Sequence, residues 1–283
     1  SVFVPGGTMN AGTEMLTLEQ LGMYSAKFER GEIDEEKLDW AKCNACPSCG
    51  ACSFIGTAST MQIMAEALGL ALPGTALMPA TSPDLLGFAR EAGRQAVRIA
   101  QMENMRPSDI VTMDSFENAI LVHAAISGST NCLLHLPAIA HEIGFDFDIT
   151  FANGVSAKTP NLCHLAPAGP TYMEDLNEAG GVYAVMNELS KKGLLYEDQI
   201  TVTGKTVGEN IKDVHNLNPE VIRPIDNPYM AQGGIAVLKG NIAPDTGIVK
   251  QSAVVPEMMV HEGPARVFDC EEDAIKAIKG GDI

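Results

Sequence analysis

The feature that most constrains this chain is a run of four cysteines at a uniform three-residue spacing. Cys43, Cys46, Cys49 and Cys52 lie in the segment KCNACPSCGAC, which begins at residue 42. The chain has seven cysteines, so more than half of its thiols fall within this short segment. Clustered thiols in a chain otherwise poor in cysteine indicate metal or redox chemistry rather than packing. Thiolates are soft ligands that suit iron–sulfur clusters, zinc or copper(I).

Several kinds of site compete for this run. A disulfide framework is least favoured, because the chain is long and the remaining cysteines (Cys132, Cys163 and Cys270) are scattered. Two Cys-x-x-Cys pairs could close a zinc tetrahedron, but zinc sites usually separate the two pairs by a dozen residues or more. The spacing favours an iron–sulfur cluster, since Cys-x-x-Cys-x-x-Cys begins a ferredoxin-type run, although the usual fourth spacing and the following proline are absent. Redox-active or inert thiols are a further alternative.

Composition bounds the class of protein. The chain has 283 residues, 46% of them hydrophobic, which is enough for one large domain or two smaller ones with a sizeable core. The formal net charge is −17, with 36 acidic residues against 19 basic ones. Such a charge opposes nucleic acid and anionic membrane surfaces as partners. Acidic residues spread along the chain are typical of a soluble cytoplasmic protein, and no apolar stretch reaches the length of a membrane span.

The first part of the chain predicts one strand followed by helices. Residues 2–4 (Val-Phe-Val), ended by Pro5-Gly6-Gly7, predict a buried parallel strand. Because a natural N-terminus rarely starts inside a core strand, we expect the chain to be part of a longer protein. Residues 14–42 predict one or two surface helices. Apolar residues at helical spacing after residue 60 predict a helix that ends at Gly69, so the cysteines lie in a loop that enters a helix N-terminus.

The middle of the chain is predicted to be mainly helical. Helices are expected over 84–101, over 115–125 with a capping pair of Asp114 and Glu117, over 132–142, after a capping pair of Thr171 and Glu174, and from Gly180-Gly181 to near Gly193. Residues 151–170, which are rich in Pro, Asn and Gly, predict a loop.

A turn rich in hydroxyl groups separates two of these helices, at residues 127–131 (Ser-Gly-Ser-Thr-Asn). A turn of small residues that enters a helix commonly holds a carboxylate or phosphate oxygen. The alternative is an ordinary N-cap, in which Ser129 or Thr130 satisfies the free amides of the following helix. The spacing alone favours the N-cap, and the two roles are compatible.

The last part of the chain changes character. Short β-rich runs at 235–238, 248–250 and 265–268 alternate with Gly and Pro turns, and a helix is expected over 271–279. This pattern predicts a second domain that begins near residue 222 and is incomplete at residue 283.

Several segments of the chain together resemble a known family. They are CPSCGAC (46–52), TASTM (57–61), AEALG (65–69), GSTN (128–131), LHL (134–136), AHE (140–142), YMEDL (172–176), AGG (179–181), TVTGKT (201–206), RPIDNP (223–228) and GNIAP (240–244). In this order, and over essentially the whole chain, they resemble the dihydroxy-acid dehydratase and phosphogluconate dehydratase family. Each segment alone is weak, but the set is highly specific.

The resemblance implies a fold and an activity. The expected fold class is α/β: residues 1–221 form part of a layered N-terminal dehydratase domain, and residues 222–283 begin a β-barrel-like, swivelling C-terminal domain. The implied enzyme is an iron–sulfur hydro-lyase with a 2Fe-2S or 4Fe-4S cluster and Mg²⁺, which converts a 2,3-dihydroxy acid to a 2-keto acid. Substrates of branched-chain amino-acid biosynthesis are favoured. Sugar acids of the phosphogluconate or pentonate type are an alternative, and a non-catalytic zinc-binding structural module is an alternative of another class.

The resemblance also implies roles for particular residues. Family members that lack the earlier cysteines of the run keep the one that matches Cys52, which makes Cys52 the expected cluster ligand. Cys49 and Cys46 are less favoured alternatives, and Cys43 is a bystander. Ser129 and Thr130 are expected to bind substrate, and a dimer or tetramer is expected.

Two further motifs of the family are absent from the chain. One is the Cys-Asp-Lys motif, which supplies a cluster cysteine, a magnesium-binding aspartate and a lysine. The other is the Asp-Gly-Arg-Phe-Ser-Gly region, which carries the serine base. The chain therefore resembles the middle portion of the enzyme, and we expect it to be inactive alone.

Overall fold

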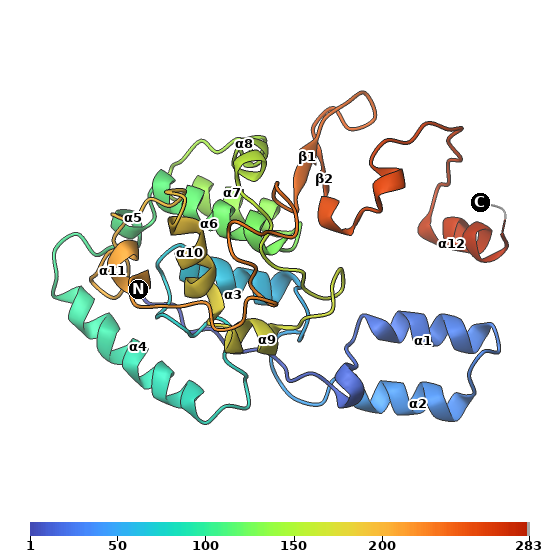
Figure 1. Ribbon diagram of the computed structural model, residues 1–283, viewed down its shortest axis with the longest axis horizontal. Coiled ribbons are helices and arrows are strands. Elements are labelled where there is room, and N and C mark those ends of the chain that lie inside the picture. Colours follow the sequence, from blue (N-terminus) through green and yellow to red (C-terminus); the bar gives the residue numbers. More distant parts are fainter. Residues whose placement is uncertain (282–283) are drawn as a thin grey trace. The chain divides into compact units, whose positions relative to one another are not determined.

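A computed structural model describes residues 1–281 (Figure 1). The end of the predicted C-terminal domain, residues 282–283, lies outside the described residues. The chain divides into two compact units, one over residues 1–253 and one that begins at Val254. The first unit holds almost all of the secondary structure, and the second contains a short 3₁₀ turn (η3, Pro256–Met258) and one helix (α12).

The secondary structure of the described residues is mainly helical. The helices are α1 (Gln20–Glu29), α2 (Glu35–Asn44), α3 (Thr57–Ala67), α4 (Asp84–Ala100), α5 (Pro107–Ile110), α6 (Met113–Ile126), α7 (Cys132–Glu142), α8 (Phe151–Lys158), α9 (Met173–Glu178), α10 (Gly181–Ser190), α11 (Val207–Ile211) and α12 (Glu271–Lys279). The strands are β1 (Ala236–Leu238) and β2 (Gly247–Val249), and η1 (Thr13–Met15) and η2 (Gln251–Ala253) are further 3₁₀ turns.

Helix α6 forms the centre of the first unit. Its residues from Ser115 to Ile126 are buried except Glu117, because the segment is apolar around most of its circumference. Helices α3, α8 and α10 pack directly against it, and Figure 1 shows α3, α6 and α10 in the middle of the unit with α8 above them. The core that they share includes Ile63, Phe116 and Val155. This packing places the first turn of α3 beside the end of α6.

Most predicted helices are confirmed, some with corrected ends. The predictions over 84–101, 132–142 and 271–279 match α4, α7 and α12, and the segment 14–42 forms two helices, α1 and α2. The predicted loop over 151–170 is wrong in its first half, which forms α8. There the burial of Ala152 and Val155 against α6 outweighs the weak helix propensity of Asn and Gly.

Two predicted capping pairs are displaced. Helix α6 begins earlier than expected, and Thr112 Oγ1 accepts a hydrogen bond of 3.1 Å from the Ser115 amide in place of the Asp114–Glu117 pair. At α9, the Asp175 carboxylate accepts a hydrogen bond of 2.7 Å from the Tyr172 amide, one residue beyond the predicted pair. Glu174 is used elsewhere, since its carboxylate accepts hydrogen bonds from the Asn10 side chain and the Ala11 amide.

The predicted buried strand over 2–4 is wrong in its burial. Phe3 makes one parallel bridge, to Ala71, and its side chain is 57% exposed. Pro5 lacks an amide hydrogen and cannot extend such a ladder. The buried parallel pairing occurs later, where Thr8 bridges both Ala51 and Pro79.

At the other end of the chain, β1 and β2 confirm the predicted strands near 235–238 and 248–250. They pair antiparallel, with Ala236 opposite Val249. The predicted strand over 265–268 is wrong. These residues form no ladder with any described segment, and the Val267 side chain is 84% exposed. In the described part of the chain, no helix is both long and apolar enough to cross a membrane.

Candidate active site

One pocket in the first unit brings together residues from four distant segments. Its volume is about 540 Å³. It is lined by Cys52 from the cysteine run, by Phe54, Ile55, Gly56, Thr57, Ala58 and Ser59 at the start of α3, by Ser129 and Thr130 from the turn between α6 and α7, and by Pro167 and Lys250. We call this the Cys52 pocket. Three of the residues singled out in the sequence, Cys52, Ser129 and Thr130, therefore share one cavity.

Backbone contacts on both sides fix the position of Cys52. Before it, the Ala51 amide donates to Gly7 O at 3.0 Å, and Ala51 O accepts from the Met9 amide at 2.6 Å. Gly50 has a φ of +119°, and a Cβ there would lie 2.5 Å from the Thr8 carbonyl carbon. After it, Ser53 O accepts a hydrogen bond of 2.9 Å from the Met173 amide. Cys52 is therefore held half-buried between two anchored segments.

The other thiols of the run lie apart from the pocket lining. Cys43 is in the last turn of α2, and Cys43, Cys46 and Cys49 are all exposed. Within residues 1–281, no three Cys, His, Asp or Glu side chains are gathered in a way that could hold a metal ion together. Burial raises the pKa of the Cys52 thiol, with a smaller contribution from the nearby Cys46. A metal that binds Cys52 must therefore displace its proton.

The turn between α6 and α7 is fastened to the start of α3. Thr60 Oγ1 accepts a hydrogen bond of 3.1 Å from the Ser129 amide and donates one of 2.7 Å to Gly56 O. The hydroxyls of Thr57 and Ser129 lie 3.2 Å apart, and the Asn131 side chain donates to Thr57 Oγ1 at 2.7 Å. The first turn of α3 and the 127–131 turn thus form one hydrogen-bonded wall of the pocket.

A buried histidine supports this wall from behind. His123 Nε2 lies 2.9 Å from Ser129 O, so it carries the ring proton in this contact. Burial lowers the pKa of His123 to about 4, which keeps the ring neutral. Gly128 fits against it because a Cβ there would lie 2.4 Å from His123 Cδ2. No sequence signal marks this role, since a single histidine in an apolar helix is usually a packed core residue.

The N-cap interpretation of Ser129 and Thr130 is not what the structure shows. The first amides of α7 bond to backbone oxygens, Cys132 N to Ser129 O and Leu133 N to Thr130 O, both at 3.1 Å. Ser129 Oγ accepts a long hydrogen bond of 3.3 Å from the Asn131 amide, which precedes the first residue of α7, and its other contact is with Thr57. The Thr130 hydroxyl has no hydrogen-bond partner within residues 1–281. It is therefore available to a molecule in the pocket.

Lys250 supplies the pocket's charge, and no sequence pattern singled it out. It follows β2 directly, and it is the single charged residue among the described residues that line the Cys52 pocket. No carboxylate of residues 1–281 lies within ion-pair distance of its ammonium group. Burial lowers the pKa of Lys250 to about 8. A lysine at the end of a short strand carries no motif, so the sequence alone could not have distinguished it.

Two family models match the chain. The family model described as dihydroxy-acid/6-phosphogluconate dehydratase N-terminal matches residues 1–210, and the corresponding C-terminal model matches residues 220–283. The chain belongs to the dihydroxy-acid/6-phosphogluconate dehydratase family. This match confirms the predicted fold class, an N-terminal dehydratase domain followed by the beginning of the C-terminal domain. The boundary near residue 222 stays a prediction.

Curated relatives of this dehydratase-family chain carry one name. Proteins named dihydroxy-acid dehydratase from Agathobacter rectalis, Lachnoclostridium phytofermentans and Clostridium beijerinckii are 57%, 56% and 54% identical to it. Each alignment covers 100% of this chain and 51% of the relative. The chain therefore spans about half the length of the curated relatives that it matches.

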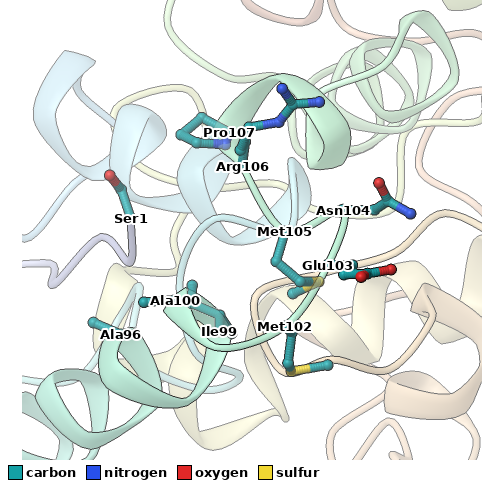
Figure 2. Close-up of a pocket in the computed structure, with 10 residues that line it drawn as sticks. All are labelled: Ser1, Ala96, Ile99, Ala100, Met102, Glu103, Asn104, Met105, Arg106 and Pro107. Carbon is teal, nitrogen blue, oxygen red and sulfur yellow. The ribbon is translucent and has the colours of Figure 1, made fainter.

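A second pocket of this dehydratase-family chain offers less chemistry. It has a volume of about 570 Å³ and lies between the end of α4 and α5 (Figure 2). Figure 2 shows the Arg106 side chain directed toward α5, where Asp109 holds it at 2.8 Å. The described lining of this second pocket contains no cysteine or histidine, and it includes Met102 and Met105. The candidate chemistry therefore remains with the Cys52 pocket.

Proposed function

We propose that the complete protein is an iron–sulfur hydro-lyase that dehydrates a 2,3-dihydroxy acid to a 2-keto acid. The proposal rests on one observation: Cys52, Ser129, Thr130 and Lys250 line the same pocket. A thiol, hydroxyl groups and a cation suit a soft metal centre beside a small hydroxylated anion. The names of the curated relatives support the same activity.

Cys52 fits the role of cluster ligand better than its neighbours do. It is the cysteine of the run that lines the pocket, whereas Cys46 and Cys49 are exposed outside it. When bound, an iron with an open coordination position would supply a Lewis acid for the departing 3-hydroxyl group. Cys52 is the one thiol among the described residues that line the pocket. By family likeness, we assign the other cluster ligands, the Mg²⁺ ligands and the serine base to the two family motifs that this chain does not contain.

The chain's own residues have binding and positioning roles in this proposal. The Thr130 hydroxyl is free to hydrogen-bond a hydroxyl or carboxylate oxygen of the substrate. Ser129 is held by Thr60 and Thr57, and the neutral ring of His123 fixes the Ser129 carbonyl from the core side. Because these groups are ordered by the fold before substrate arrives, little conformational entropy is lost when substrate binds.

We propose 2,3-dihydroxy-3-methyl acids of branched-chain amino-acid biosynthesis as substrates, with sugar acids as the alternative. The full-length protein should be assayed against 2,3-dihydroxy-3-methylbutanoate and against 6-phosphogluconate and a pentonate. Formation of a 2-keto acid from the first compound supports the proposal. Turnover of sugar acids alone would contradict the proposed substrate class, but it would still support the proposed hydro-lyase reaction.

Metal analysis of the same preparation tests the cofactor. Iron and sulfide with Mg²⁺-dependent turnover support the proposal, whereas zinc without iron and no turnover would favour a non-catalytic zinc-binding module. By family likeness we also propose that the protein is a cytoplasmic homo-oligomer, either a dimer or a tetramer. Light scattering of the full-length protein would measure the mass of this oligomer.

A further inference from the structure

The charge of the Cys52 pocket is opposite to that of the whole chain. The chain carries a formal charge of −17, yet the described lining of the pocket contains one cation, Lys250, and no carboxylate. A half-buried ammonium group without a counter-ion is unfavourable, because burial removes hydration that no partner replaces. A lysine kept in such a place is best explained by an anion that enters the pocket.

The fold anchors the chain on both sides of Lys250, which lines the pocket together with Ser129 and Thr130. On one side of it, β2 pairs with β1, and the β1 residue Val237 is bonded through both its amide and its carbonyl to the Asn153 side chain of α8, at 2.7 and 2.8 Å. On the other side, the Gln251 side chain bonds to Gly233 O, and the Ser252 amide donates to Gly234 O at 3.2 Å.

Gly234 links this segment to the turn that carries Ser129 and Thr130. Its amide donates to Ala124 O of α6 at 3.1 Å, and a Cβ at Gly234 would collide with the Ser127 side chain. Ser127 in turn accepts a hydrogen bond from the Asn161 side chain. These contacts fix the backbone at Lys250 relative to the turn that carries the hydroxyl groups of the pocket.

We propose that Lys250 binds the carboxylate of the hydroxy acid that enters the Cys52 pocket, an inference that rests on the proposed function. Three N–H donors on its ammonium group can hold a carboxylate through charge-assisted hydrogen bonds. His123, which lies behind the Ser129 wall of the pocket, is buried and neutral and does not compete for the anion. Lys250 is therefore a specificity residue that selects acids over uncharged diols.

The test compares a carboxylate with its uncharged analogue. Full-length protein carrying Lys250→Gln or Lys250→Arg is titrated by calorimetry with 2,3-dihydroxy-3-methylbutanoate and with the corresponding amide. Lys239→Gln is the matched control, because Lys239 lies exposed in the same hairpin outside the pocket. Lys250→Gln should weaken carboxylate binding roughly 10- to 100-fold and leave amide binding unchanged. Lys250→Arg should recover much of the affinity, and Lys239→Gln should bind as the wild type does.

Other results would overturn the assignment. Equal losses for acid and amide, or no loss for either, would show that Lys250 does not recognise the carboxylate. Loss of iron and of visible absorbance in Lys250→Gln would instead assign the lysine to the metal centre. If the wild-type protein binds the acid but does not dehydrate it, the proposed function fails, and the carboxylate-to-amide comparison still decides the role of Lys250.

Discussion

The Ser129 amide donates a hydrogen bond of 3.1 Å to Thr60 Oγ1, which in turn donates one of 2.7 Å to Gly56 O. One buried hydroxyl thus joins the first turn of α3 to the turn between α6 and α7, two segments that are far apart in the sequence. The wall of the Cys52 pocket depends on this link. Its removal should therefore affect stability as well as binding.

Thr60→Val keeps the shape of the side chain and removes the hydroxyl. The part-buried Ser129 amide would lose its partner, whereas Gly56 O would keep the hydrogen bonds from the Thr60 amide and the Ser59 hydroxyl. We therefore expect a loss of about 1–3 kcal/mol in the free energy of unfolding, mainly from the unsatisfied Ser129 amide. Thermal denaturation of the full-length protein measures this. Thr81→Val is the control, since the Thr81 hydroxyl bonds to Asn10 at the surface. A loss no larger than that of the control would mean that the link has no structural importance.

Gly128→Ala should be poorly tolerated. The added methyl group would lie 2.4 Å from His123 Cδ2 and 2.8 Å from Thr60 Cγ2, so the turn or the histidine must move. We expect a destabilisation of about 1–3 kcal/mol together with weaker substrate binding. Gly154→Ala in α8 is a matched control, because a Cβ there meets nothing within 4 Å. The control should be neutral or slightly stabilising, and similar behaviour of the two variants would contradict the packing described for the turn.

Thr130→Val tests the free hydroxyl of the pocket. Because this hydroxyl has no hydrogen-bond partner within residues 1–281, its loss should leave thermal stability and iron content unchanged. Turnover should fall by an amount equivalent to roughly 1–3 kcal/mol in kcat/KM. Steady-state kinetics, with iron analysis and a thermal melt of the same sample, would show this. Unchanged kinetics with a lower melting temperature would give Thr130 a purely structural role.

Glu66 predicts a pH dependence of stability away from the pocket. Its carboxylate is buried and accepts hydrogen bonds from the amides of Gly74 and Ala76 at 2.9 and 2.8 Å. Burial, opposed by these bonds, raises its pKa from 4.5 to about 7. The folded state then binds more protons than the unfolded state between these values, so the contribution of Glu66 to stability falls as the pH rises through this range.

Glu66→Gln should remove this part of the pH dependence, because the amide does not titrate. Melting temperatures of the wild-type protein and the variant are measured across pH 4.5 to 7. The wild-type value minus the variant value should fall steadily as the pH rises. Glu103→Gln, at an exposed position, should follow the wild type throughout. If the melting temperature of the wild type minus that of the variant increased with rising pH, this result would contradict a raised pKa for Glu66.

Sequence patterns predicted the parts of this fold whose residues repeat at a helical period. Helices α4, α7 and α12 could be placed because their apolar or charged faces recur regularly. Helix α8 could not, because its helicity depends on burial against α6 rather than on local propensity. The exposure of Phe3 was likewise unpredictable, since an apolar β-rich run looks the same whether or not another layer covers it.

The candidate site divides in a similar way. The thiol and hydroxyl motifs could be recognised in the sequence, but their spacing alone left all four cysteines of the run open and favoured an N-cap for Ser129 and Thr130. The family resemblance singled out Cys52, Ser129 and Thr130, and their roles stay predictions. Lys250 and His123 could not be recognised, because their importance comes from tertiary contacts: a strand end anchored beside the turn, and a buried ring behind Ser129.

The most direct test of the proposed iron site is iron retention in Cys52→Ser. The full-length variant should lose its brown absorbance, its iron and its dehydratase activity, because Cys52 is the thiol of the run that lines the pocket. Cys43→Ser, in the same run but exposed at the end of α2, should keep all three. Iron retained at the wild-type level in Cys52→Ser, or lost in Cys43→Ser instead, would contradict the central assignment.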